Sequence, residues 1–383
     1  MASTYVDSAT GATVIQWTTG PAKNQHLYFT SPSVTEDDRW LTFISDRTGD
    51  PNLFAIDRRD GSIRQLSRNT AGLLRGYVYP QGGRTGLAKA SPCLDAKHNR
   101  LFYIRNDAVY VVDLDEPEPA DRKACELPAN SYTAFTHISP DGQTLCVPIV
   151  DARAFDEPMQ TQWEQLRRVP TIMQSAGYTT GIWLIDTATG RMQLAADVPF
   201  WVTHVQFDPS GSGRIVFNKE GQWPTTGVPL PDRVWCLEPG GAFRPLAPEA
   251  DGEWRSHENW SPDGNSVVYH GSLHGKPFVA SRAWDGELLH QASLEGLTLY
   301  HATAAVDGRH LFIDKPDGYI ALVDPTGGRL QSTNICRHDS SCRDQDAHVH
   351  PVTSSHGKSV VFTSDRTGEC NVYEVLLAES SGP

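Results

Sequence analysis

A turn of small polar residues, followed by a short β-branched or aromatic run, recurs along the whole chain. Asp-Gly turns between alternating strands are typical of β-hairpins, and repeats of 40 to 50 residues with about four strands each are typical of propeller blades. We therefore predict an all-β fold, a seven-bladed β-propeller of four-stranded antiparallel blades that forms a single domain over residues 1–383. The seven turns lie roughly 45 to 70 residues apart, at 35–38, 94–97, 139–142, 208–211, 261–264, 306–308 and 354–357.

The first and last repeats are nearly copies of each other. Ser45-Asp-Arg-Thr-Gly49 in the first matches Ser364-Asp-Arg-Thr-Gly368 in the last. A β-sandwich does not explain this recurrence, whereas a ring in which the terminal blades are neighbours does. We expect residues 1–18, through the run Thr13-Val-Ile-Gln-Trp17, to provide a closing strand for the last blade.

One segment departs from the β pattern. Residues 159–175 include Gln-Trp-Glu-Gln-Leu-Arg-Arg, a composition that favours helix. We predict a short helical insertion within residues 156–178. Two interpretations remain open: a surface decoration, or a flap that offers Trp163, Arg167 and Arg168 to a ligand.

Composition narrows the functional class and the compartment. The formal net charge of −13 argues against a general nucleic-acid binder. The sequence contains no run of 18 apolar residues that would predict a membrane span. The N-terminus has no basic and apolar leader, and the seven cysteines are scattered without a Cys-x-x-Cys pair. We predict reduced thiols and a cytoplasmic protein. The sequence gives no indication of the oligomeric state.

Several catalytic motifs are absent from the sequence. It has no Gly-x-Ser-x-Gly elbow, no phosphate-binding P-loop, no dinucleotide glycine fingerprint and no His-Glu-x-x-His. These absences exclude the corresponding hydrolases, nucleotide-binding enzymes and zinc proteases.

Histidines concentrate in the C-terminal half, just before the repeated turns. His348 and His350 are two residues apart and would face the same side of a strand, so they can hold one ion. Gln345 can add an amide oxygen, and His301 occupies the equivalent place one repeat earlier. Because equivalent positions of successive blades converge around the axis, we expect the three histidines to lie together at one candidate metal site, which Gln345 can join. His257 and His204 hold similar places in the two preceding repeats.

The Ser-Pro-Asp-Gly phrase resembles the TolB-like propeller repeat, and the histidine phrases resemble oligogalacturonate lyase, a propeller enzyme that uses a manganese-type divalent metal. The resemblance implies a metal cage of three histidines and one glutamine at His301, Gln345, His348 and His350. It implies that the base lies in the phrase Ser-His257-Glu-Asn-Trp260. It further implies that the substrate-binding, charge-stabilising arginine is Arg233, in Asp232-Arg233-Val-Trp235.

Other positions around these phrases bear on the substrate. His26, in His-Leu-Tyr-Phe29, resembles an N-terminal phrase of the family, and we expect His204 and Lys219 to bind substrate. The chain departs from the family where Lys219 precedes Glu-Gly in place of a histidine. It also departs in the loop 222–231, which carries a tryptophan and three prolines. These departures leave the identity of the sugar open.

The residue types suit the β-elimination that the resemblance implies. Abstracting the C5 proton of a uronate builds negative charge on its carboxylate, which a divalent metal and an arginine can stabilise, and a histidine is a suitable base. We expect a lyase of short oligogalacturonides that binds Mn²⁺. Two alternatives remain: a lyase for another oligouronide, such as a glucuronide or a rhamnogalacturonan fragment, or a non-catalytic propeller that binds a protein or peptide.

Overall fold

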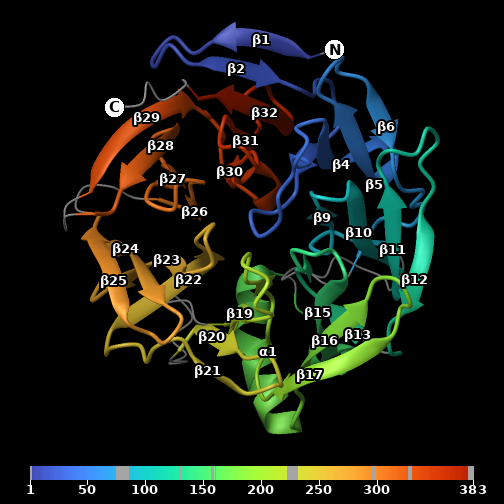
Figure 1. Ribbon diagram of the computed structural model, residues 1–383, viewed down its shortest axis with the longest axis vertical. Coiled ribbons are helices and arrows are strands. Elements are labelled where there is room, and N and C mark those ends of the chain that lie inside the picture. Colours follow the sequence, from blue (N-terminus) through green and yellow to red (C-terminus); the bar gives the residue numbers. More distant parts are fainter. Residues whose placement is uncertain are drawn as a thin grey trace.

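Seven β-sheets surround a central axis in the computed structural model (Figure 1), which describes residues 2–74, 86–129, 131–156, 159, 161–221, 232–294, 299–326 and 330–377. The sheets follow one another around the ring in sequence order. The prediction of a seven-bladed propeller is therefore confirmed.

Four of the blades are four-stranded antiparallel meanders, as the sequence predicts. The first is β3 (Asn24–His26), β4 (Trp40–Thr48), β5 (Asp50–Asp57) and β6 (Ile63–Gln65); the fourth is β18 (Val205–Phe207), β19 (Ile215–Asn218), β20 (Val234–Leu237) and β21 (Phe243–Pro245). The fifth is β22 (Glu253–Trp260), β23 (Ser266–Leu273), β24 (Lys276–Ala283) and β25 (Leu288–Ser293); the sixth is β26 (Ala302–Ala304), β27 (Leu311–Asp314), β28 (Tyr319–Asp324) and β29 (Gln331–Arg337).

The other three blades carry extra strands. The second adds β7 (Leu73–Leu74) and β8 (Leu87–Ala88), a parallel pair, to β9 (Cys93–Asp95), β10 (Arg100–Arg105), β11 (Ala108–Asp113) and β12 (Arg122–Glu126). The third splits its innermost strand into β13 (Ser131–Thr133) and β14 (His137–Ile138), beside β15 (Thr144–Asp151), β16 (Thr180–Asp186) and β17 (Met192–Val198). The last is β30 (Val352–Thr353), β31 (Ser359–Ser364), β32 (Asn371–Leu376), β2 (Thr13–Gln16) and β1 (Ser3–Val6).

The N-terminal segment closes the ring. Strand β2 pairs antiparallel with β32, with Ile15 opposite Glu374, and this is where the sequence predicts a closing strand. Just after β2, the Thr18 hydroxyl donates to the side chain of Asn371 and accepts from the backbone of Val372. In the first blade, Ser67 makes the same two contacts to Asn52 and the residue after it. The repeated Ser-Asp-Arg-Thr-Gly segments therefore precede equivalent anchors of a fourth strand.

The repeated turns have a shared internal chemistry. In the third blade the Ser139 hydroxyl bonds to Asp141 and accepts from the backbone of Thr144, and Gly142 donates back to the Ser139 carbonyl. Gly142 has a φ of 69°, which favours glycine. The fifth blade repeats these contacts. The turn sequence thus fixes the reversal between the first and second strands of a blade.

The direction of the strands determines which connections between them lie on the same face of the ring. The repeated turns end the innermost strands at one mouth of the channel, so these strands begin at the opposite mouth. Each second strand runs back, so its connection to the third strand lies where the innermost strands begin. Helix α1 (Gln162–Ala176) joins β15 to β16 and therefore lies at that face, preceded by the 3₁₀ turn η1 (Ala152–Phe155).

Helix α1 is the predicted helical insertion. The Thr161 side chain caps its N-terminus, and Gly177, with φ of 69°, ends it. Its buried side chains, including Leu166, pack against Val150 and Trp201, so the helix is docked on the blades. The Trp163 side chain lies outside the described residues. The cores between neighbouring blades are formed by alternating inward strand residues, as Phe217 shows in the fourth blade.

Two further observations concern the helices and the cysteines. Among the described residues, no helix is long and apolar enough to cross a membrane. All seven cysteines lie in the described part of the chain and each has a free thiol, five of them buried.

Candidate active site

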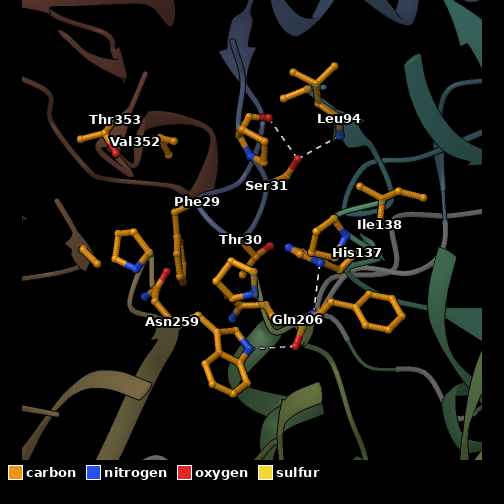
Figure 2. Close-up of a pocket in the computed structure, with 18 of the residues that line it drawn as sticks. Phe29, Thr30, Ser31, Leu94, His137, Ile138, Gln206, Asn259, Val352 and Thr353 are labelled. Carbon is orange, nitrogen blue, oxygen red and sulfur yellow. Dashed lines mark hydrogen bonds between the residues drawn. The ribbon is translucent and has the colours of Figure 1, made fainter. Parts of the chain in front are cut away.

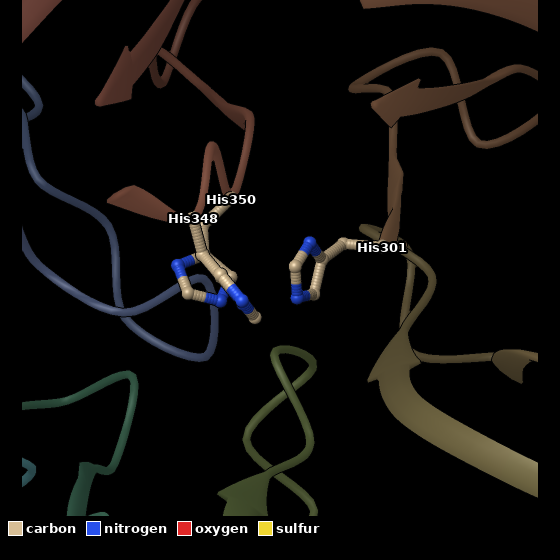
Figure 3. Close-up of side chains that lie close together, drawn as sticks. All are labelled: His301, His348 and His350. Atoms are coloured by element: carbon tan, nitrogen blue, oxygen red, sulfur yellow. The ribbon is translucent and has the colours of Figure 1, made fainter. Parts of the chain in front are cut away.

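Three imidazoles converge where two innermost strands begin (Figure 3). His301 precedes β26, and His348 and His350 precede β30, so adjacent blades present them to the axis. One nitrogen from each lies within 4.8 Å of the others. Figure 3 shows the ring of His301 facing those of His348 and His350 across a narrow gap. The predicted three-histidine cluster is therefore assembled by the fold.

A buried carboxylate orients His301. Asp314, at the end of β27 and 0 % exposed, accepts from the His301 ring Nδ1 at 2.7 Å and from its backbone N–H at 2.6 Å. This fixes the ring and leaves Nε2 as the nitrogen that faces the cluster. A carboxylate behind a histidine is a common outer-shell arrangement at metal sites.

The other two histidines carry nitrogens that no protein group satisfies. Among the described residues, His348 Nδ1 and His350 Nε2 are buried without a hydrogen-bond partner. Burial lowers the pKa of His348 to about 4 and that of His350 well below its ordinary range, so both rings are neutral near pH 7. Buried, neutral and unpaired imidazole nitrogens are suited to a metal ion. His350 also has a φ of 43°, a costly conformation that is common at functional sites.

Gln345 lies beside the cluster. It begins the short 3₁₀ helix η3 (Gln345–Ala347), which the Asp344 side chain caps. Gln345 lines a small cavity of about 30 Å³ together with His348 and His350. Such a volume accommodates an ion or a water molecule and is too small for a sugar ring, which must lie in the open mouth above.

His257 lies next to the cluster on the neighbouring blade. A β-bulge in β22 interrupts the pairing between Ser256 and Asn259, and at the bulge His257 has a φ of 52°. Its ring lies 4.6 Å from that of His301, centroid to centroid. Its Nδ1 is 2.7 Å from His270 Nε2 on β23. Burial and the neighbouring histidines lower the pKa of His257 well below its ordinary value.

Arg233, just before β20, is the centre of a buried charge network. Its side chain is 2 % exposed; Nη1 donates to Glu220 at 3.3 Å and Nε lies 3.6 Å from Glu258. Glu258 also bonds the ring of His204 at 2.9 Å. Although burial alone would raise the pKa of Glu220, Arg233 and His204 lower it to about 2. The network orients the guanidinium and the His204 ring.

Lys219 belongs to a different environment. Its ammonium lies 5.6 Å over the ring of Phe200, whereas the next residue, Glu220, points to Arg233. Because successive residues of an extended chain face opposite sides, Lys219 points away from the Arg233 network. The loop 222–231 that follows lies outside the described residues.

His26, Tyr28 and Phe29 of the first blade contact residues of other blades around the axis. His26 Nε2 bonds the His350 carbonyl at 2.8 Å, and Nδ1 bonds Thr363. Beyond β3 the chain makes a tight turn, in which Ser31 N–H donates to the Tyr28 carbonyl. The ring of Phe29 in this turn lies within about 6 Å of four histidine rings from four other blades: His204, His257, His301 and His350.

A second, larger cavity lies on the other side of Phe29. It has a volume of about 400 Å³ and opens at the mouth that carries the repeated turns, with Pro140 and Pro262 in its wall. Figure 2 shows Phe29 and His137 in this cavity. The His137 ring accepts a hydrogen bond at Nδ1 from the backbone of Phe207, so this nitrogen has a structural role. The Phe29 turn thus separates this cavity from the histidine cluster.

Sequence reasoning did not identify the partners that orient the site. They are Asp314, Glu220, Glu258 and His270. Glu258 stood next to His257 in the quoted phrase, but nothing in the sequence linked it to Arg233. Asp314 and His270 lie on second strands, and only pairing with the innermost strands brings them to His301 and His257.

Comparison with known proteins identifies the family of this chain. The family model for oligogalacturonate lyase matches residues 1–381. The chain is 23% identical over 403 residues to an oligogalacturonide lyase of Pectobacterium atrosepticum, and 24% identical over 406 residues to the oligogalacturonate lyase of Dickeya dadantii. Each alignment covers 98% of this chain and 96% of the relative.

Solved structures show the same fold. An oligogalacturonate lyase in complex with manganese superposes with a TM-score of 0.82 at 22% identity, covering 99% of this chain and 97% of its own. The oligogalacturonate lyase from Vibrio parahaemolyticus gives a TM-score of 0.82 at 20% identity, with coverages of 100% and 98%. The family match over nearly the full length identifies this chain as a member of the oligogalacturonate lyase family.

Proposed function

We propose that this protein cleaves short oligogalacturonides by β-elimination, with a divalent cation, Mn²⁺, held by His301, His348, His350 and Gln345. The observation that carries the proposal is the cluster of buried, unpaired imidazole nitrogens directly beside His257. The manganese complex of a structural relative supports the choice of metal, because imidazole ligands alone suit several metals.

The chemistry of the donor set fits such an ion. His348 and His350 are uncharged near pH 7 and face His301, whose ring Asp314 holds in place. When bound, a divalent cation supplies positive charge that offsets the negative charge building on the substrate carboxylate. The protein contributes fixed ligands and a partly dry environment in which that charge acts strongly.

His257 is the proposed base that takes the C5 proton. Its hydrogen bond to His270 occupies Nδ1 and leaves Nε2 as the nitrogen that can accept a proton. Its lowered pKa keeps the ring neutral, and therefore competent as a base, near pH 7.

Arg233 is the proposed fixed cation of the site. Glu220 and Glu258 hold its guanidinium in place, so its charge is preorganised before substrate arrives. Direct contact with a carboxylate requires part of this buried side chain to be uncovered. His204, held by Glu258, is proposed to bind substrate beside Arg233. Lys219 is proposed to bind a part of the substrate away from the Arg233 network, because its ammonium lies over Phe200.

The test is incubation with digalacturonate and Mn²⁺, followed by the ultraviolet absorbance of an unsaturated product. We expect the absorbance to increase when metal is present and the increase to stop when a chelator is added. No product from any oligouronide, with metal content confirmed, would refute the lyase function. A parallel panel of glucuronides and rhamnogalacturonan fragments tests the substrate class, since Lys219 and the loop 222–231 depart from the family.

The free thiols of all seven cysteines support a cytoplasmic location.

A further inference from the structure

The elimination proposed above needs a proton donor as well as a base. Breaking the C4–O4 bond leaves the departing sugar as an alkoxide, which is a poor leaving group until it is protonated. In a galacturonate ring the C5 hydrogen and the C4 oxygen lie on opposite faces. A base at one face therefore cannot protonate the oxygen at the other, and a second residue must do so.

Tyr28 lies where such a donor is needed. Its ring is 4.7 Å from His350, 5.5 Å from His204 and 4.0 Å from Phe135, centroid to centroid. These residues belong to three other blades, so the ring projects into the axial channel. Tyr28 is half-buried and lines the small cavity with His348 and His350. It adjoins one proposed metal ligand, His350, whereas His257 adjoins another, His301.

The local turn holds the phenol in place. The Tyr28 carbonyl accepts from Ser31, and Leu27 donates to the Ser33 hydroxyl, so both sides of the turn are fixed. The ring stacks on Phe135. A ring held in this way keeps its hydroxyl in a restricted position, which favours proton transfer to a substrate bound beside it.

Arg233 favours the charge that Tyr28 would carry after donation. The phenol lies close enough to the guanidinium for the two groups to interact electrostatically. A nearby cation stabilises a phenolate and therefore lowers the barrier to giving up the proton. Two other histidines near Tyr28 are engaged otherwise, since His26 uses both ring nitrogens and His204 binds Glu258.

We propose that the Tyr28 hydroxyl is the general acid that protonates the leaving O4, an assignment that rests on the proposed lyase function. The C5–H bond breaks and its proton goes to His257. The electron pair forms the C4=C5 double bond, the C4–O4 bond breaks, and O4 takes the Tyr28 proton. His257 later releases its proton to water and Tyr28 regains one from water, so no co-reactant is consumed.

The test compares two substrates that differ in leaving group. Digalacturonate needs its leaving oxygen protonated, whereas a galacturonide with a 4-nitrophenyl ether at O4 releases a stable phenolate without help. For Tyr28→Phe we expect turnover of digalacturonate to fall about 100-fold or more, the usual range for a general acid. Turnover of the nitrophenyl ether should fall less than tenfold, with KM and metal content close to wild type.

A matched control removes a hydroxyl beside another arginine. Tyr5, on the outer strand β1, accepts from Arg366, and Tyr5→Phe should leave both substrates unaffected. Equal losses on the two substrates in Tyr28→Phe, or a loss below tenfold on digalacturonate, would overturn the assignment. Absence of product with the wild-type protein would instead refute the lyase function, and the Tyr28 assignment with it.

Discussion

Asp314→Asn isolates the contribution of one buried carboxylate to metal binding. In the wild type both carboxylate oxygens accept from His301, one from the ring and one from the backbone. Asparagine keeps the shape but offers a single acceptor oxygen, and its NH₂ group would face an N–H donor. The ring of His301 loses a charge-assisted hydrogen bond and part of its basicity, so the metal loses a well-oriented ligand.

The magnitude follows from the nature of that bond. A charge-assisted hydrogen bond is roughly twice as strong as a neutral one, a difference of about 1–2 kcal/mol. Loss of an outer-shell partner typically lowers metal affinity by about 10- to 100-fold, which is about 1.4–2.7 kcal/mol. We therefore expect Asp314→Asn to bind Mn²⁺ at least about tenfold more weakly.

The assay is a Mn²⁺ titration against a competing chelator, with unfolding in urea to show that the variant is folded. Asp307→Asn is the matched control, because Asp307 accepts the backbone and ring N–H groups of His310 in the same way on the exposed turn of the same blade. A folded Asp314→Asn protein with affinity within twofold of wild type would refute the reasoning. So would an equal loss in the control.

The remaining predictions concern roles, metal and closure. His257→Ala should abolish turnover with metal content intact, whereas His348→Ala should lose both; near-normal turnover of His257→Ala would rule it out as the base. Chelation should lower the melting temperature, because a ligand at 100 times its Kd stabilises by about 2.7 kcal/mol, and Mn²⁺ should restore it; a melting temperature unaffected by either would contradict a metal bound to the folded state. Thr18→Val should destabilise the fold by about 1–3 kcal/mol in urea, since it leaves the buried Val372 N–H without its acceptor. An effect below about 0.5 kcal/mol would mean that this anchor does not hold the closing strand.

Local chemistry made the fold predictable. A Ser-Pro-Asp-Gly turn bonds within itself, as Ser139 and Asp141 show, and it joins strands that are adjacent in sequence. Seven repeated turns, two of them Ser-Pro-Asp-Gly, and matching terminal repeats therefore determine the number of blades and the closure. The extra strands of the second blade were not predictable, because β7 and β8 are two-residue strands that pair in parallel and no repeated turn lies between them.

The site was predictable only in part, for a related reason. His301, His348 and His350 could be grouped because a propeller brings the starts of innermost strands together. The assignment of Mn²⁺ and of Arg233 came from family resemblance and not from spacing.

The sequence by itself determined the repeat, the strand order and the cluster of histidines, since these depend on short-range hydrogen bonding and on symmetry. Only the tertiary structure decided which groups orient them. His26 bonds His350 across 324 residues, and Glu258 meets His204 across 54. Such pairs depend on side-chain direction and strand register in different blades. The position of Tyr28 and Phe29 in the channel is of the same kind, because their rings pack against residues of later blades.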